Sequence, residues 1–385
     1  MYCIDCEMLD TGCREIKHRV SGKETDMALS ERENYLRNAS MTGPEWMPCS
    51  VSISGASWDQ LREDLEDVLV RHPTLFPSFK RAQRNYDKQD FGPAHRADET
   101  FTDAWGCVWR SAINGIEGQV EENPLADWSE FPSYEPPDPL VQADRGLANW
   151  ESARKRIEAA RKAGRLTSGG VPHGFLFMRL YYLRGFDNLM MDVATDAPQL
   201  PRLIDMLVEH NKKIVEQWLS FGVDVVNFGD DLGTQTASMI SPENFHRLVT
   251  PAYKALMQPC REAGCHVYLH SDGYIMELMD EFIEAGVTII NPQDLCNGID
   301  DLAREVKGRM CISLDIDRQK IIPYGTRAAI RELIEEEVRK LGSPQGGLQM
   351  IAGIYPPTPP ENIDALCSAM EEFRTYWWDG RGSSA

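Results

Sequence analysis

The stretch VDVVNFGDDLGTQTASMISPENFHRLVTPAYKAL, residues 223–256, carries the pattern that decides the fold. Its apolar run at 223–228 has the length of a buried strand, and polar residues follow directly where the run ends. Ser241 and Pro242 then predict a helix start, because a serine hydroxyl caps first-turn N–H groups and proline fits the first turn. Apolar residues recur at helical spacing as far as Leu256, and Gly264 stands where a helix end is expected. The stretch therefore predicts a strand followed by a crossover helix.

The same alternation continues through the chain after Pro172 and predicts several parallel strands joined by helices. A further helix is predicted after Thr326, with apolar residues on one face and Gly342 at its end. The predicted strands are Gly174–Tyr181, Val223–Phe228, His266–Leu269, Val287–Ile290, Met310–Leu314 and Leu348–Ala352, with an early one at Pro48–Ile53.

These units predict a (β/α)8 TIM barrel over residues 41–380. Residues 1–40 are predicted to form an N-terminal arm with a helical piece around residues 30–36, which we expect to pack on the barrel or on a second copy in a homodimer. Residues 87–150 are rich in Trp, Pro, Gly and acidic residues, so we expect an insertion of short strands and loops there.

Composition narrows the possible partners. The 385 residues carry a formal net charge of −20, which argues against nucleic acid or an anionic membrane as partner. No apolar run reaches the roughly 20 residues that span a bilayer, and the start resembles no signal peptide, so we expect a cytoplasmic protein. Cys3, Cys6 and Cys13 form a cluster without a second Cys pair, and its role stays unassigned.

Polar residues gather at the predicted strand ends, where catalytic groups of α/β barrels lie. They are Asp230, Asp231, Gln235, His270, Asp272, Asn291, Gln293, Asp315 and Tyr355. His270 and Asp272 are two residues apart, so both side chains can point to the same side of the barrel mouth and share a zinc ion or a substrate group. Zinc usually has three protein ligands, and the sequence does not identify the third.

Each of these residues also has an ordinary structural interpretation. Asp230 and Asp231 could cap a helix, and Asp272 with the following glycine could form only a turn. His270 could be a hydrogen-bonded core residue, and Asn291 before a proline could mark a loop.

The quoted stretch, followed by HSDG (270–273), GVTIINPQD (286–294), LDID (314–317) and PPENIDAL (359–366), resembles the uroporphyrinogen decarboxylase-like superfamily. The resemblance runs from about Tyr181 to Met370, and DAWGCVW (103–109) and EPPDPL (135–140) add to it. It implies a (β/α)8 barrel with the active site at the C-terminal mouth. The superfamily includes uroporphyrinogen decarboxylases and cobalamin-dependent methyltransferases.

Two departures decide between these branches. The decarboxylases bind an octa-anionic substrate with an arginine-rich motif of the form RQAGRY, whereas no arginine stands between Met41 and Trp58 here. Methyltransferases of methanol and methylamine metabolism carry zinc on a His-x-Cys pair and a distant Cys. His270 matches that His, Asp272 stands in place of the first Cys, and no Cys stands at 352–355. The HxDG variant resembles the branch that we associate with substrate-side methyltransferases, including O-demethylases.

The sequence therefore predicts an enzyme that moves a methyl group from a small donor, such as a methoxylated aromatic, to the cob(I)alamin of a corrinoid protein. His270, Asp272 and Asp230 are the predicted catalytic or metal-binding groups, and zinc is the predicted metal. The donor would be bound by the other strand-end residues with Tyr181, Trp46 and Trp105, although buried Trp residues are more often core. Two alternatives stay open, a carboxy-lyase of the uroporphyrinogen decarboxylase type and a non-catalytic barrel that binds a tetrapyrrole or corrinoid.

Overall fold

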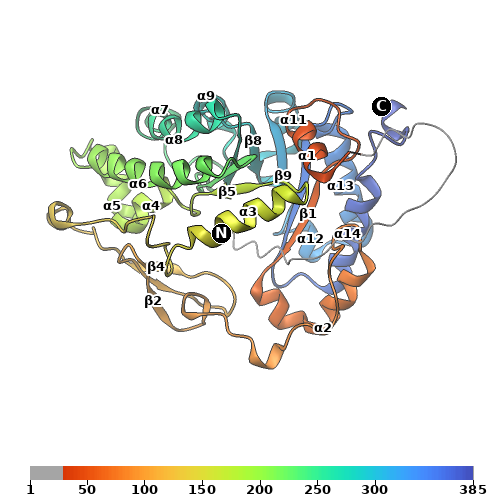
Figure 1. Cartoon of the computed structure of the whole chain (residues 1–385), viewed down its shortest axis with the longest axis horizontal. Coiled ribbons are helices and arrows are strands. Elements are labelled where there is room, and N and C mark those ends of the chain that lie inside the picture. The colour runs from red at the N-terminus through yellow and green to blue at the C-terminus, as the bar shows by residue number, and fades with distance from the viewer. Residues whose placement is uncertain (1–28, 385) are drawn as a thin grey trace.

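Seven parallel strands form one curled sheet at the centre of the molecule (Figure 1). The computed structural model describes residues 29–384. Within these residues, β1 and β5 are the two edges of the sheet. This is the TIM-barrel type of fold that the sequence predicts, with seven hydrogen-bonded strands in place of eight. In spatial order the strands are β1 (Cys49–Ile53), β10 (Leu348–Ile354), β9 (Cys311–Asp315), β8 (Ile289–Pro292), β7 (His266–Ser271), β6 (Val225–Gly229) and β5 (Ser168–Gly170).

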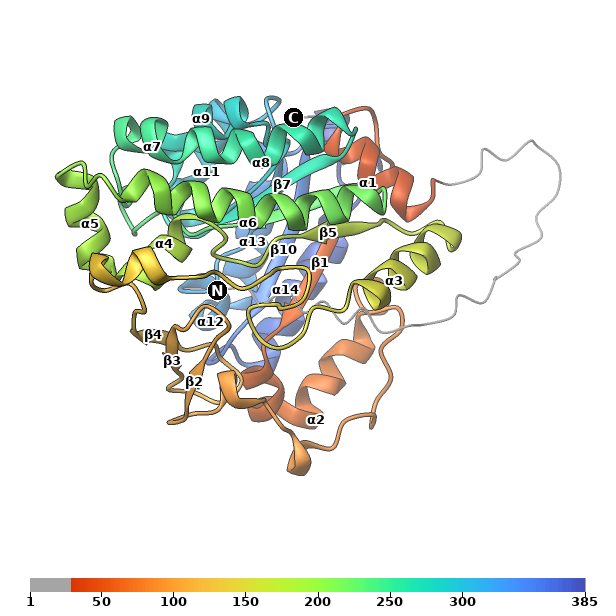
Figure 2. The same ribbon diagram turned by 60° about the vertical axis from the view of Figure 1, so that its left-hand side comes forward.

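Helices cover the outer face of this sheet (Figures 1 and 2). Their apolar sides face the strands, as in α13, where the hydroxyl of Thr326 caps the first turn and Gly342 ends the helix as predicted. The outer helices are α2 (Gly55–Arg71), α3 (Trp150–Lys162), α6 (Leu200–Ser220), α7 (Pro242–Leu248), α8 (Thr250–Glu262), α9 (Met279–Ala285), α11 (Ile299–Glu305), α13 (Arg327–Leu341) and α14 (Pro360–Phe373).

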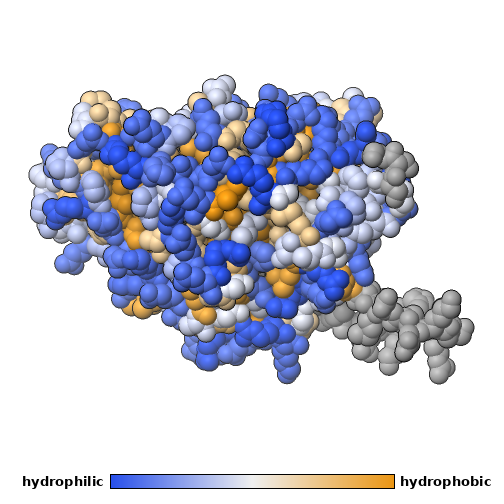
Figure 3. Space-filling view, turned by 90° about the horizontal axis from the view of Figure 1, so that it is seen from above, coloured by the Kyte–Doolittle hydropathy of each residue, from blue (hydrophilic) through white to orange (hydrophobic). Residues whose placement is uncertain are grey.

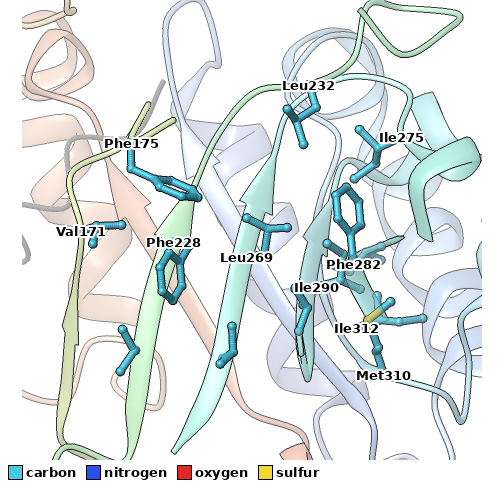
Figure 4. Packing of buried hydrophobic residues seen from close by; sticks show 14 of the residues in the cluster. Val171, Phe175, Phe228, Leu232, Leu269, Ile275, Phe282, Ile290, Met310 and Ile312 are labelled. Atoms are coloured by element: carbon cyan, nitrogen blue, oxygen red, sulfur yellow. The ribbon is translucent and has the colours of Figure 1, made fainter. Parts of the chain in front are cut away.

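The main core lies between the strands and these helices. Figure 4 shows Phe228, Leu269, Ile290 and Ile312 on adjacent strands within one continuous cluster, and each is fully buried. Because side chains alternate across a strand, the residues between them point into the barrel. The outer positions of the strands therefore fold the protein, and the inner positions are available for a site.

Two sequence predictions need correction. The strand predicted at Gly174–Tyr181 is instead a loop leading into α4 (Phe177–Arg184), and the barrel strand is the short β5 before it. The single helix predicted after Ser241 is two, because Pro251 has no N–H to continue the hydrogen-bond ladder from α7 into α8. The segment between α2 and α3, where the sequence predicts an insertion of short strands and loops, holds a separate antiparallel sheet.

That separate sheet belongs to the segment between α2 and α3. Its strands are β2 (Thr100–Thr102), β3 (Val108–Arg110) and β4 (Gln119–Glu122), flanked by short 3-10 turns. Figure 2 places it below α4 and α5 (Phe186–Ala194), which follow β5 in the chain. The insertion therefore packs beside the barrel and adds no strand to the central sheet.

Helix α1 (Glu31–Ala39) packs at the N-terminal end of the barrel. Tyr35 and Ala39 contact Tyr268, Ile289 and Cys311, whose side chains point inward near the starts of their strands. This contact closes the end opposite the predicted site. Cys3, Cys6 and Cys13, and most of the predicted arm, lie outside the described residues.

No helix among the described residues has the length and apolar character needed to cross a membrane. The face seen in Figure 3 is mainly hydrophilic, with apolar side chains in small separate groups.

Candidate active site

The inward-pointing residues of the barrel form layers whose members are fixed by strand register. Asn227, Tyr268, Ile289 and Cys311 pair across β6 to β9 and form the lower layer. Two residues further along, Gly229, His270 and Asn291 pair across β6, β7 and β8. The next inward positions hold Asp231, Asp272 and Gln293, and Gln293 pairs with Asp315 of β9. Six of the predicted strand-end residues therefore lie in two adjacent layers at the mouth: Asp231, His270, Asp272, Asn291, Gln293 and Asp315.

His270 has a defined orientation and tautomer. The side-chain nitrogen of Asn291 donates to the carbonyl of Ser313, so Asn291 Oδ1 faces His270 Nδ1 at 2.7 Å and accepts a hydrogen bond from the Nδ1–H. His270 Nε2 then points to the upper layer, 3.4 Å from Asp272 Oδ1 and 3.6 Å from Asp231 Oδ1. The imidazole is 3% exposed. Its neutral form thus presents a lone pair to two carboxylates.

A second histidine, His173, completes this cluster and was not predicted. It follows β5, and its Nε2 lies 3.3 Å from Asp231 Oδ1, while the two imidazole rings have centroids 5.5 Å apart. The ring fits because Gly229 has no side chain: a Cβ there would lie 2.6 Å from His173 Cδ2. In the sequence, His173 stands among apolar residues in VPHGF and is indistinguishable from a core histidine.

The charges of these four groups depend on one another. Burial alone would raise the pKa of Asp231, but its contact with His173 holds that pKa well below the usual range. Burial would also raise the pKa of Asp272, but the contacts with His270 and Arg318 outweigh burial and lower this pKa. Burial lowers the pKa of His173, whereas for His270 the two carboxylates outweigh burial and raise the pKa. Both carboxylates are therefore ionised at neutral pH, and the cluster attracts positive charge.

Arg318 is a site residue that the sequence analysis missed. Its Nη2 donates to both oxygens of Asp272 at 2.6 and 2.7 Å, and its Nη1 lies 3.2 Å from Asp315 Oδ2. The guanidinium also lies over the ring of Tyr355, 5.5 Å from the centroid. Arg318 follows β9 in LDIDRQK, where an arginine two residues before Lys320 gives no sign of a buried partner.

A cavity opens beside Arg318 between the loops after β8 and β9. The short helices α10 (Asp294–Asn297) and α12 (Ile321–Tyr324) flank it. Three predicted substrate-binding residues, Gln235, Gln293 and Asp315, are among its lining residues. Gln293 Oε1 also accepts from the backbone N–H of Gly273 at 3.0 Å, which fixes the side chain across the HSDG turn.

Asp230 lies apart from this cluster. It is fully buried, and its oxygens accept from the backbone N–H groups of Phe177 and Met178 at 2.6 and 2.8 Å and from the Tyr253 hydroxyl at 3.0 Å. Burial raises the pKa of Asp230 to about 7 against these hydrogen bonds. Asp230 therefore caps the first turn of α4, the structural interpretation that the sequence left open, although for a helix that precedes it in the chain.

The aromatic residues predicted for the donor pocket separate into two groups. Tyr181 on α4 is half-buried, and burial together with the negative charges of Asp231 and Asp230 raises its pKa, so Tyr181 lies on the side of the cluster. Trp46 precedes β1, at the end of the barrel opposite the mouth, under the guanidinium of Arg374. Trp105 is buried in the insertion, where its indole N–H donates to Asp144 at 2.8 Å. The expectation that Trp46 and Trp105 line the site is wrong.

Comparison with known proteins places this arrangement in a family. The profile of the uroporphyrinogen decarboxylase (URO-D) family matches residues 113–373. The chain belongs to the URO-D family. No curated protein matches it in sequence.

Solved structures similar to this chain include one methyltransferase with the same fold and, at lower structural similarity, two other enzymes. A methyltransferase from Methanosarcina mazei is similar with a TM-score of 0.58 and 18% identity, covering 89% of this chain and 98% of that chain. A putative vitamin-B12 independent methionine synthase from Listeria monocytogenes has a TM-score of 0.40 and 14% identity, covering 59% and 69% of the two chains. The 3-keto-D-glucoside 4-epimerase from E. coli has a TM-score of 0.36 and 14% identity, covering 59% and 87%.

URO-D family membership confirms the resemblance drawn from the sequence motifs. The matched region contains His173, Asp231, His270, Asp272 and Arg318. The mouth cluster is therefore built wholly from the URO-D portion of the chain.

Proposed function

We propose that this chain is a methyltransferase that moves a methyl group from a small methylated donor, such as a methoxylated aromatic, to the cob(I)alamin of a corrinoid protein. The observation that carries the proposal is the charge of the mouth. Arg318 contacts the carboxylates of Asp272 and Asp315, and Asp231, which accepts from the backbone N–H of Asp272, adds a third carboxylate. Such a site suits a neutral or cationic donor and opposes the octa-anionic substrate of a decarboxylase.

The transfer needs two things from the protein. Cob(I)alamin donates an electron pair to the methyl carbon, the bond from that carbon to oxygen breaks, and the oxygen leaves with the bonding pair. The site must therefore hold donor and cobalt in line and supply a proton or cation to the leaving oxygen. His270 would serve the second task, because Asn291 orients its ring and its Nε2 faces the upper layer of polar groups.

Other groups at the mouth would orient the donor. Gln235 and Gln293 line the cavity with amide groups, and Tyr355 packs against Arg318 at its side. A solved methyltransferase has the same fold, so the fold is compatible with this reaction. The corrinoid partner would approach the barrel mouth, because that is where the strand ends place the polar groups.

Incubation of the full chain with reduced free cobalamin and a panel of methoxyarenes and methylamines tests the proposal. We expect methylcobalamin to form with at least one donor, and we expect His270→Ala to lower the rate by about 10²-fold or more. The matched control is His246→Ala, which removes an exposed histidine of α7 that pairs with Glu281 and is not part of the mouth cluster. A folded protein that methylates cobalamin from no donor would refute the proposal, and binding of cobalamin without turnover would favour the non-catalytic barrel.

A further inference from the structure

We infer that His173, Asp231 and His270 form a binding site for a divalent transition-metal ion, and that Asp272 anchors Arg318 instead of binding the metal. The choice of Zn²⁺ among such ions rests on the proposed function, because methyl transfer needs a Lewis acid without redox change. The ligand set itself rests only on the geometry of the three side chains. It differs from the pair His270 and Asp272 predicted from the sequence.

The distances fit a tetrahedral ion. Bonds of about 2.0–2.2 Å to nitrogen and oxygen place tetrahedral ligand atoms about 3.3–3.5 Å apart. Asp231 Oδ1 lies 3.3 Å from His173 Nε2 and 3.6 Å from His270 Nε2, and all three ligand atoms lie within 4.8 Å of one another. The side chains therefore need little movement to meet one ion.

The surroundings hold each ligand in place. Asn291 Oδ1 accepts from His270 Nδ1, which leaves Nε2 as the coordinating atom. Asp231 Oδ1 accepts from the backbone N–H of Asp272 at 3.0 Å, so the carboxylate is fixed before any ion binds. His173 Nε2 is buried without a well-aligned hydrogen bond and faces Asp231. A buried nitrogen in this state is costly, and an ion would satisfy it.

Asp272 Oδ1 lies 3.4 Å from His270 Nε2, but both oxygens of Asp272 already accept from Arg318 Nη2. Two imidazoles and one carboxylate are three protein ligands, which is the number that catalytic zinc sites use with the fourth position left for substrate. A zinc ion held there would act as a Lewis acid on the leaving oxygen of the donor. Within residues 29–384, one other group has ligand atoms this close, His246 with Glu281 and Glu284, and it is more exposed at the surface.

Metal binding is measured on the full chain without donor or cobalamin, so the outcome does not depend on the proposed reaction. The chain is treated with a chelator, dialysed and titrated with Zn²⁺ against a chromophoric competitor, and Co²⁺ is added separately for its visible absorption spectrum. We expect one tight site. His173→Ala and Asp231→Asn should weaken it by at least about 100-fold, whereas Asp272→Asn should weaken it by only about 10-fold, the lower end of the range for groups that contact a ligand without binding the metal.

His246→Ala is the matched control, because it removes a histidine from the exposed cluster, and it should leave the tight site unchanged. Melting temperatures of all variants without metal separate loss of ligand from loss of fold. No tight Zn²⁺ or Co²⁺ binding, or His173→Ala binding as tightly as the parent, would overturn the inference. Loss of binding in Asp272→Asn equal to that in Asp231→Asn would return the site to the pair predicted from the sequence.

Discussion

Gly229→Ala is the sharpest perturbation of the proposed site, because it adds one methyl group to a residue that makes no contact of its own with a ligand. The added Cβ would lie 2.6 Å from His173 Cδ2, whereas ordinary contacts between such atoms begin near 3.4 Å. The imidazole must therefore move by about 0.8 Å. The backbone at Gly229 does not have a positive φ, so the backbone conformation suits alanine and the only conflict is with the imidazole of His173.

A ligand displaced by this amount no longer meets a metal held by Asp231 and His270. We expect Zn²⁺ affinity to fall by about 10- to 100-fold and methyl transfer by about 100-fold, as displacements near 1 Å do elsewhere. Overpacking should cost about 1–3 kcal/mol of unfolding free energy. Competition titration with Zn²⁺ and urea unfolding measure the two effects separately.

The double variant Gly229→Ala/His173→Ala decides the cause. If the methyl group acts through the imidazole, removing His173 leaves it nothing more to disturb, and the double variant should bind zinc no more weakly than His173→Ala alone. A loss of zinc affinity in the double variant equal to the sum of the losses in the two single variants would refute the reasoning. Unchanged affinity in Gly229→Ala would refute it as well.

Three further variants test other parts of the site. Asp230→Asn should cost about 1–3 kcal/mol in urea unfolding, because an amide nitrogen would face a backbone N–H at the start of α4; an unchanged midpoint would contradict the capping role. Arg318→Met should lower stability by about 3 kcal/mol, since it removes the cation between the buried carboxylate of Asp315 and the half-buried one of Asp272; a loss below about 0.5 kcal/mol would show that the contacts are unimportant. In Glu337→Gln, stability relative to the parent should rise between pH 5 and pH 8. Burial beside Asp294 holds the pKa of Glu337 well above its usual range, so its stabilising contribution is complete below the unfolded pKa and is lost as pH rises toward the folded one. Parallel stability curves for the two proteins would exclude this account.

The sequence predicted the strands that are bounded by apolar runs and missed the one that is not. The five strands from β6 to β10 and the early β1 lie within three residues of their predicted bounds, because each carries an apolar outer face. β5 is the triplet Ser168–Gly170, whose Gly169 leaves room for the ring of Trp218. A strand built from glycine has no hydrophobic pattern, so the sequence predicts the strand in the neighbouring apolar run GFLFMRLY instead. That run is helical because Asp230, 52 residues away from Met178, caps its first turn.

The candidate site divides in the same way. His270, Asp272, Asn291, Gln293 and Asp315 end apolar strands, and a rule about barrel strand ends was enough to select them. Neither His173 nor Arg318 ends a strand. Both reach the mouth from loops, and their positions depend on contacts that only the assembled barrel creates.

Gly229 explains why that dependence matters for function. In its layer, β7 contributes an imidazole and β8 an amide, while β6 contributes no side chain at all. The space left on β6 is filled by His173 from the loop after the neighbouring strand, and this places a second imidazole beside the first. A larger residue at 229 would fold into the same layer and exclude His173, leaving His270 with carboxylates alone. The smallest residue of the layer thus determines whether the mouth can hold a metal, and its substitution tests the proposed site more directly than removal of any ligand.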